Sequence, residues 1–203
     1  MEKYVVTITR QFGSLGRPIA KRLSEILQIE YYDRDIVEKT AERMNLPVSV
    51  ISDQEERSSG FFRMLFPLGT EAEEKQRRLF QVQSEIISRL AEKGSCIIVG
   101  RCADYVLAEE RNAVHVCVYA PYADRLANCV GTLGMKKDVA KRMIAEVDKA
   151  RLAYHKRFAH YAPDDPAHKH LIINSALLDV EGTAQALAAF VKIKLGMDQT
   201  GER

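Results

Sequence analysis

The chain begins with an apolar, β-branched run that leads through a short glycine-containing loop directly into a helical pattern. Residues 4–9 read Tyr-Val-Val-Thr-Ile-Thr, and apolar side chains recur at helical spacing from Pro18 to Leu27. In such a strand-loop-helix unit, the backbone N–H groups of the loop and of the first helical turn point toward one common site. The helix dipole adds roughly half a positive charge at that site. The segment therefore predicts a phosphate-binding loop over residues 10–18.

The loop lacks the common nucleotide-binding signature. The pattern GxxxxGK[ST] does not occur, and the loop ends in Gly16-Arg17-Pro18. Arginine supplies charge and a two-pronged donor in place of lysine, so Arg10 or Arg17 is expected to reach a phosphate. The alternative is a purely structural turn.

Apolar runs of strand length alternate with helical patterns along the rest of the chain. This alternation predicts an α/β fold with a mostly parallel sheet, right-handed crossovers and helices on both faces. In such sheets, ligands bind beyond the carboxyl ends of the strands. The segments that follow the first three expected strands, and so lie at that edge, are residues 10–18, Asp33 and residues 100–104. The expected strands cover 4–9, 29–33, 95–99, 113–119 and 171–174, and the expected helices cover 18–27, 33–44, 71–93, 122–130, about 135–158 and 179–195.

Composition limits the classes of protein to consider. With 203 residues, 46% of them hydrophobic and 29% charged, we expect one globular domain, and a net charge of +2 gives no broad basic field for nucleic acid. The absence of a long apolar run or a signal-peptide pattern predicts a cytoplasmic protein without a membrane segment. The four cysteines are well separated, which argues against zinc and against a disulfide framework.

One segment interrupts the alternation. Residues 48–73 look irregular and contain a dense apolar patch from Phe61 to Leu68. Its aromatic side chains either tuck into the core or form a flap over a substrate or partner.

Taken together, the motifs resemble the cytidylate kinase-like family of P-loop nucleoside monophosphate kinases, and the resemblance runs almost end to end. It implies a three-layer P-loop NTPase fold with a helical lid, in a single kinase-like domain over residues 1–203. Residues 34–94 would form its acceptor-binding helical segment, and residues 134–162 its lid. The resemblance rests on Thr9-Arg10-Gln11-Phe12-Gly13-Ser14, Ile19-Ala20-Lys21, Tyr32-Asp33, Ile98-Val99-Gly100-Arg101-Cys102-Ala103-Asp104, the Asp148/Arg151/Tyr154 spacing and Asn174-Ser175.

The resemblance also implies which residues hold the donor phosphates. When the chain is aligned without gaps on the helix after the loop, Gly16 occupies the position of the family's lysine and Pro18 that of its threonine. When the alignment is shifted by one residue, Arg17 occupies the lysine position instead. In either alignment the hydroxyl expected to bind magnesium is absent, and Ser14 is the substitute ligand we predict. The predicted phosphate-binding residues are Arg10, Gly13, Ser14, Leu15, Gly16, Arg17 and Pro18.

For the acceptor, the resemblance implies contacts from Asp33, Gly100, Arg101 and Asp104, although Asp33 is equally well placed to cap the following helix. The predicted catalytic residues are Arg17, Arg101 and Arg151. In the lid, Asp148, Arg151 and Tyr154 are expected on one helical face, with Arg151 as the phosphate contact. Arg142 completes the predicted lid set, Arg125 fits either a functional or a surface role, and no histidine is assigned.

The implied activity is transfer of the ATP γ-phosphoryl group, with Mg²⁺, to a nucleoside monophosphate such as cytidylate or to another small acceptor. One alternative is a binding protein for nucleotides or phospho-ligands that has lost catalysis with its lysine and hydroxyl. Another is an RNA- or partner-binding protein that uses the basic stretch 136–157 and the apolar patch Phe61 to Leu68, although the interleaved aromatics of a stacking surface are lacking. The expected partners are small nucleotides, and the chain is expected to be a monomer or homodimer.

Overall fold

Five parallel strands form the centre of the protein, in the order β2-β3-β1-β4-β5. This is a computed structural model, and it describes residues 2–45 and 70–197. The all-parallel order confirms the predicted sheet. The strands are β1 (Val5–Arg10), β2 (Glu30–Tyr32), β3 (Cys96–Val99), β4 (Ala113–Tyr119) and β5 (Leu171–Asn174).

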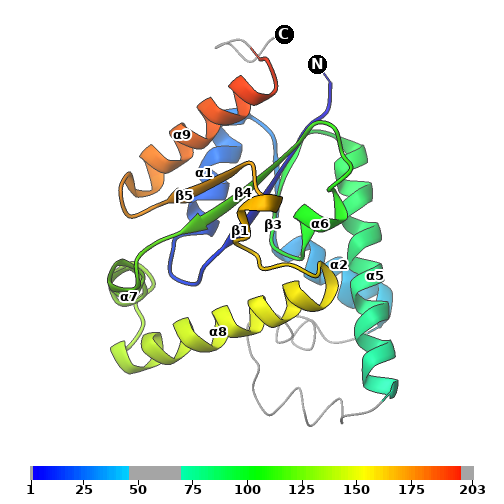
Figure 1. The fold of residues 1–203 in the computed structure, drawn as a ribbon, viewed down its shortest axis with the longest axis horizontal. Coiled ribbons are helices and arrows are strands. Elements are labelled where there is room, and N and C mark those ends of the chain that lie inside the picture. The colour runs from blue at the N-terminus through cyan, green and yellow to red at the C-terminus, as the bar shows by residue number, and fades with distance from the viewer. Residues whose placement is uncertain (1, 46–69, 198–203) are drawn as a thin grey trace.

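Helices cover both faces of the sheet because its central strands are apolar on both sides. Val6 and Ile8 of β1 face α1 (Gly16–Leu27) and α9 (Asp179–Lys194), and they are completely buried. Val5 faces the other way, toward α5 (Thr70–Lys93) and α2 (Arg34–Met44). Figure 1 shows α1 and α9 side by side on one face and α5 beyond the other, which confirms the three-layer prediction.

Two further helices position the site. α7 (Tyr122–Gly131) packs on α8 (Lys137–Phe158), and α8 runs as one long helix past the sheet (Figure 1). Its buried side includes Ile144 and Val147. The long basic helix expected after Gly134 is therefore confirmed as a helix.

Two short elements were missed by the sequence patterns, because four and three residues carry too little periodicity: α6 (Ala103–Val106) and the 3-10 helix η1 (Pro166–His168). The apolar patch 61–68 lies outside the described residues. Among the described residues, no helix is both long enough and apolar enough to span a bilayer.

Two histidines, His115 near the start of β4 and His170 just before β5, stack on each other. The rings of His115 and His170 lie 5.0 Å apart between centroids, and His115 Nδ1 is 2.8 Å from the Thr7 hydroxyl. Burial, together with the neighbouring His170, lowers the pKa of His115 to about 4. The folded protein therefore keeps this imidazole neutral where an unfolded chain would protonate it.

This difference makes stability depend on pH. Between pH 6.5 and about 4 the unfolded chain binds a proton at His115 that the folded chain does not, so the free energy of unfolding falls as the pH falls, by up to about 3 kcal/mol. His115→Asn, which keeps a polar group near the Thr7 hydroxyl, is expected to flatten the stability curve over this window. Urea denaturation of both proteins at several pH values measures the effect, and parallel curves would contradict it.

Candidate active site

The loop between β1 and α1 is built around one glycine and one left-handed leucine. Gly13 has a φ of +80°, and an added Cβ there would lie 2.8 Å from the carbonyl oxygen of Arg125 and 2.9 Å from Cys129 Sγ. Leu15, at the N-cap of α1, has a φ of +58°. The glycine lets the loop pack closely against α7, and the turn at Leu15 leads the chain into α1.

The Arg10 side chain passes through the space beside the loop. It is buried, with 6% of the side chain exposed. An added Cβ at Gly16 would lie 2.7 Å from Arg10 Cβ, and one at Gly100 would lie 2.2 Å from Arg10 Nη1. A side chain at Gly16, where the resemblance places the family's lysine, therefore has no room unless Arg10 moves.

Asp33, directly after β2, lies close to Arg10 and Arg17. Its carboxylate lies 2.5 Å from Arg17 Nε and 3.9 Å from Arg10 Nη2, and only 4% of the side chain is exposed. Asp33 occupies the N-cap position of α2, but its side chain makes no capping hydrogen bond. The capping alternative is therefore wrong for the side chain, which faces two arginines instead.

Two adjoining cavities open at the carboxyl end of the sheet. The loop cavity, of about 110 Å³, is lined by Arg10, Gln11, Phe12, Gly13, Leu15, Gly16, Arg17, Pro18, Leu133 and Arg151. The second, which we call the arginine cavity, is lined by Thr9, Arg10, Gly100, Arg101, Cys102, Arg151, Tyr154, His155 and Pro163. Arg10 and Arg151 line both, so these two residues stand at the boundary between the cavities.

Side chains of α7 and α8 hold the loop backbone. Asp148 accepts a hydrogen bond of 2.8 Å from the Phe12 N–H, and it forms an ion pair with Arg125. Arg125 also donates to the Phe12 carbonyl at 3.3 Å, and only 11% of its side chain is exposed. A surface role for Arg125 is therefore wrong. The Phe12 amide is used inside the protein rather than being directed at a ligand.

Two more hydrogen bonds connect side chains of α7 and α8 to the backbone of the loop. Asn128 donates to the Gly13 carbonyl at 2.9 Å, and Arg151 Nη1 donates to the Arg10 carbonyl at 3.2 Å. The α8 helix is thus joined directly to the loop, and a shift of α8 would move the loop with it.

Ser14 does not fit the role of a magnesium ligand. Its fully buried hydroxyl has one hydrogen, which lies between two acceptors: the carbonyl oxygens of Gln11 and Val118, at 2.9 and 3.1 Å from Oγ. Ser175 in turn donates to the Ser14 carbonyl at 2.8 Å, which fixes the loop to the end of β5. Among the described residues, no group of three or more His, Cys, Asp or Glu side chains is arranged to hold a metal ion.

Asp104 lies in a buried charged cluster behind the arginine cavity and is not among the residues that line that cavity. It pairs with Lys169, accepts a hydrogen bond of 3.1 Å from the Tyr161 hydroxyl, and lies 3.3 Å from His155 Nε2. Burial by itself would raise the pKa of Asp104, but His155 and Lys169 outweigh it and hold this pKa well below its usual range. Sequence patterns missed these three partners because they come from distant segments with no shared motif.

The predicted lid residues are brought together in part. Asp148 and Arg151 contact the loop from α8. Tyr154 lines the arginine cavity instead, and its hydroxyl donates to Gln83 Oε1 of α5 at 2.7 Å. Arg142 is exposed on the same helix and lines neither cavity.

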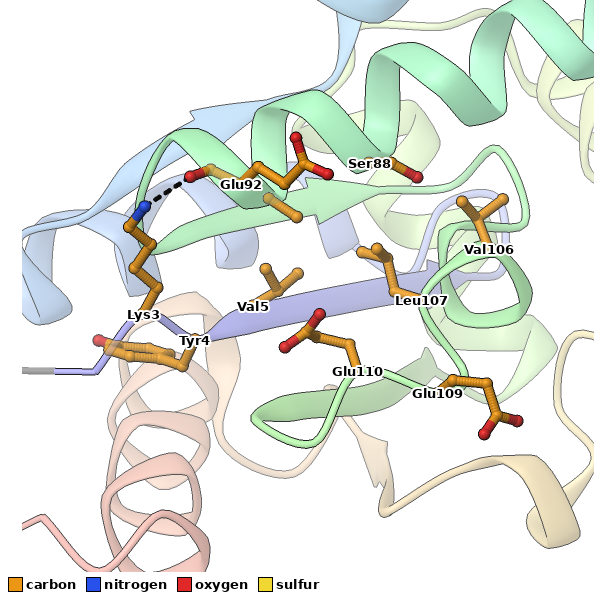
Figure 2. A pocket seen from close by; sticks show the side chains of 10 residues that line it. Lys3, Tyr4, Val5, Ser88, Glu92, Val106, Leu107, Glu109 and Glu110 are labelled. Carbon is orange, nitrogen blue, oxygen red and sulfur yellow. Dashed lines mark hydrogen bonds between the residues drawn. The ribbon is translucent and has the colours of Figure 1, made fainter.

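A different cavity, of about 600 Å³, opens near the start of β1, between the end of α5 and the segment after α6 (Figure 2). Lys3 Nζ donates to the Glu92 carbonyl at its rim, and the lining carboxylates of Glu92, Glu109 and Glu110 are exposed. Because it lies at the amino ends of the strands and its charged groups are in solvent, it is a weaker candidate than the arginine-lined pair.

Comparisons with known proteins agree with this architecture. A protein of Eubacterium ventriosum is 21% identical, with a TM-score of 0.72 over 94% of this chain and 99% of that one. A shikimate kinase from Bacteroides thetaiotaomicron (14% identity, TM-score 0.55, 94% and 99% coverage) and a sugar kinase from Janibacter (13% identity, TM-score 0.53, 100% and 99% coverage) share the fold.

No curated protein matched the chain. The model of the cytidylate kinase-like family, however, matches residues 5–177, which include both cavities and all five strands. The fold is that of the P-loop kinases. The chain belongs to the cytidylate kinase-like family.

Proposed function

We propose that this protein transfers the γ-phosphoryl group of ATP to a small acceptor, with a nucleoside monophosphate such as cytidylate as the first candidate. The observation that carries the proposal is the set of arginines around two adjoining cavities at the carboxyl end of the sheet: Arg10, Arg17, Arg101 and Arg151. Phosphoryl transfer needs little covalent help from the protein, and depends on donors that align the phosphates and neutralise their charge.

In this proposal the loop cavity takes the donor phosphates and the arginine cavity takes the acceptor. Arg17 and the first-turn amides of α1 hold the donor, and Arg101 orients the acceptor. The transferring group lies between Arg10 and Arg151, which line both cavities. Magnesium bound with ATP would supply further charge neutralisation, but we assign it no ligand from this chain because Ser14 does not fit.

The test is an ADP-release assay with magnesium across a panel of nucleoside monophosphates and small metabolites that carry hydroxyl groups. At least one acceptor is expected to raise ADP release well above the rate with ATP alone. A panel in which no acceptor exceeds that background would contradict the proposal.

Arg101→Ala is expected to lower kcat/KM for that acceptor by about 10²-fold, since a buried guanidinium in the acceptor cavity is lost. Arg111→Ala, at an exposed arginine outside both cavities, is the matched control and is expected to keep the wild-type rate. Equal rates for both variants would remove Arg101 from the site.

A second candidate is a nucleotide- or phospho-ligand-binding protein without turnover. Two features favour this function. Gly16 stands where the family has its lysine, and the Ser14 hydroxyl is hydrogen-bonded to backbone carbonyls instead of facing a ligand. Calorimetric binding of nucleotide, together with no acceptor-dependent ADP release, would identify this function.

A further inference from the structure

Cys102 belongs to a cluster of three ionisable side chains at the wall of the arginine cavity. Its Sγ lies 3.5 Å from His155 Nδ1, and His155 Nε2 lies 3.3 Å from Asp104 Oδ2. Cys102 and His155 both line the cavity. We propose that Cys102 is a reactive thiol, at which peroxides and soft electrophiles modify the protein and obstruct the arginine cavity.

The backbone fixes the position of this thiol. Gly100, Arg101 and Cys102 have consecutive positive φ angles of 78°, 61° and 52°. The last two are left-handed residues with side chains, a conformation that costs energy and must be stabilised by its surroundings. This turn, directly after β3, sets Sγ against His155 on α8.

The groups around Sγ are of the kinds that activate cysteines. His155 Nδ1 is placed 3.5 Å from Sγ, and Asp104 Oδ2 lies 3.3 Å from Nε2 on the opposite side of the imidazole ring. The guanidinium-bearing residues Arg10, Arg101 and Arg151 line the same cavity. A neighbouring histidine and positive charges are the features that make cysteines reactive.

The other three cysteines provide an internal comparison because they are equally buried. Cys96, Cys117 and Cys129 are each at most 2% exposed, as is Cys102. Burial raises the pKa of all three, that of Cys96 to about 12. A higher reactivity of Cys102 than of the other three cysteines would therefore be caused by His155, Asp104 and the arginine cavity, and not by a difference in solvent exposure.

With a peroxide, the reaction is a two-electron oxidation of sulfur. The thiolate attacks one peroxide oxygen, an S–O bond forms, and the O–O bond breaks. The leaving hydroxide takes the proton held by His155 and departs as water, which leaves a sulfenic acid on Cys102. The added oxygen lies in the arginine cavity, and a thiol reductant restores the original side chain.

The experiment measures the alkylation rate of each cysteine in the intact native protein, by brief exposure to iodoacetamide followed by peptide mass spectrometry. Cys102 is expected to react at least about tenfold faster than the other three. A second sample, treated with hydrogen peroxide and then dimedone, is expected to carry the dimedone mass on Cys102.

His155→Asn, which cannot take up the proton, is expected to lower the Cys102 rate toward that of the other thiols. His168→Asn is the matched control: this exposed histidine stacks on Tyr161 at 3.7 Å, and is expected to leave the rate unchanged. Thermal melting verifies that both variants remain folded. Equal rates for the four thiols, or an unchanged rate in folded His155→Asn, would overturn the proposal.

These readouts do not depend on turnover, so they can fail or succeed independently of the kinase proposal. Only the consequence for activity rests on the proposed function: oxidised protein is expected to lose acceptor-dependent ADP release and to regain it with dithiothreitol.

Discussion

Arg10→Ala is expected to lower kcat/KM for phosphoryl transfer by about 10²–10³-fold and to weaken the binding of ATP. Arg10 passes between Gly16 and Gly100 and lines both cavities, so its positive charge is shared by the donor and acceptor sites of the proposal. The ADP-release assay, with the acceptor that the panel identifies, measures the rate, and calorimetry measures the affinity for ATP.

The matched control is Arg22→Ala, on the same helix as Arg17. Arg22 pairs with Glu181 and Glu25 at the surface and lines neither cavity, so wild-type kinetics are expected. Arg10→Lys keeps the charge but loses the planar fork, and an intermediate rate is expected. Wild-type kinetics in a folded Arg10→Ala protein would contradict the assignment of Arg10.

Asp104→Asn is expected to lower the free energy of unfolding by about 3–5 kcal/mol at pH 7. The substitution removes the carboxylate from a buried cluster and leaves the Lys169 ammonium, whose side chain is 0% exposed, without its partner. Urea denaturation followed by circular dichroism measures the change.

Glu181→Gln is the control for this experiment. It removes one charge from an ion pair with Arg22 in which both side chains are 40% or more exposed, and such surface pairs contribute less than about 1 kcal/mol. A loss for Asp104→Asn no larger than that for Glu181→Gln would contradict the structural role of the buried cluster.

The fold could be predicted from the sequence because its strands and long helices each carry a clear period. The apolar run Cys96–Val99 is a central strand buried on both faces, and the helical spacing of Leu79, Ile86 and Leu90 matches the buried side of α5. Parallel strands also bring residues 10–18, Asp33 and Gly100 to one edge, and the contacts of Arg10 with the last two confirm that juxtaposition.

The details of the site could not be predicted, since they depend on which distant side chains meet. Nothing near Asp104 in the sequence indicates that Lys169 and His155 surround it, and nothing near Phe12 indicates Asp148. Asp33 stands where a helix cap is expected, but the arginines opposite compete for its carboxylate.

A crystal structure with a non-hydrolysable ATP analogue and magnesium would show directly whether the loop cavity binds the donor phosphates. The terminal phosphates are expected to lie in the loop cavity, within hydrogen-bonding distance of the Arg10 and Arg17 guanidinium groups and the amides at the start of α1. An analogue bound elsewhere, with Asp33 still in contact with both arginines and the loop cavity without phosphate, would contradict this expectation.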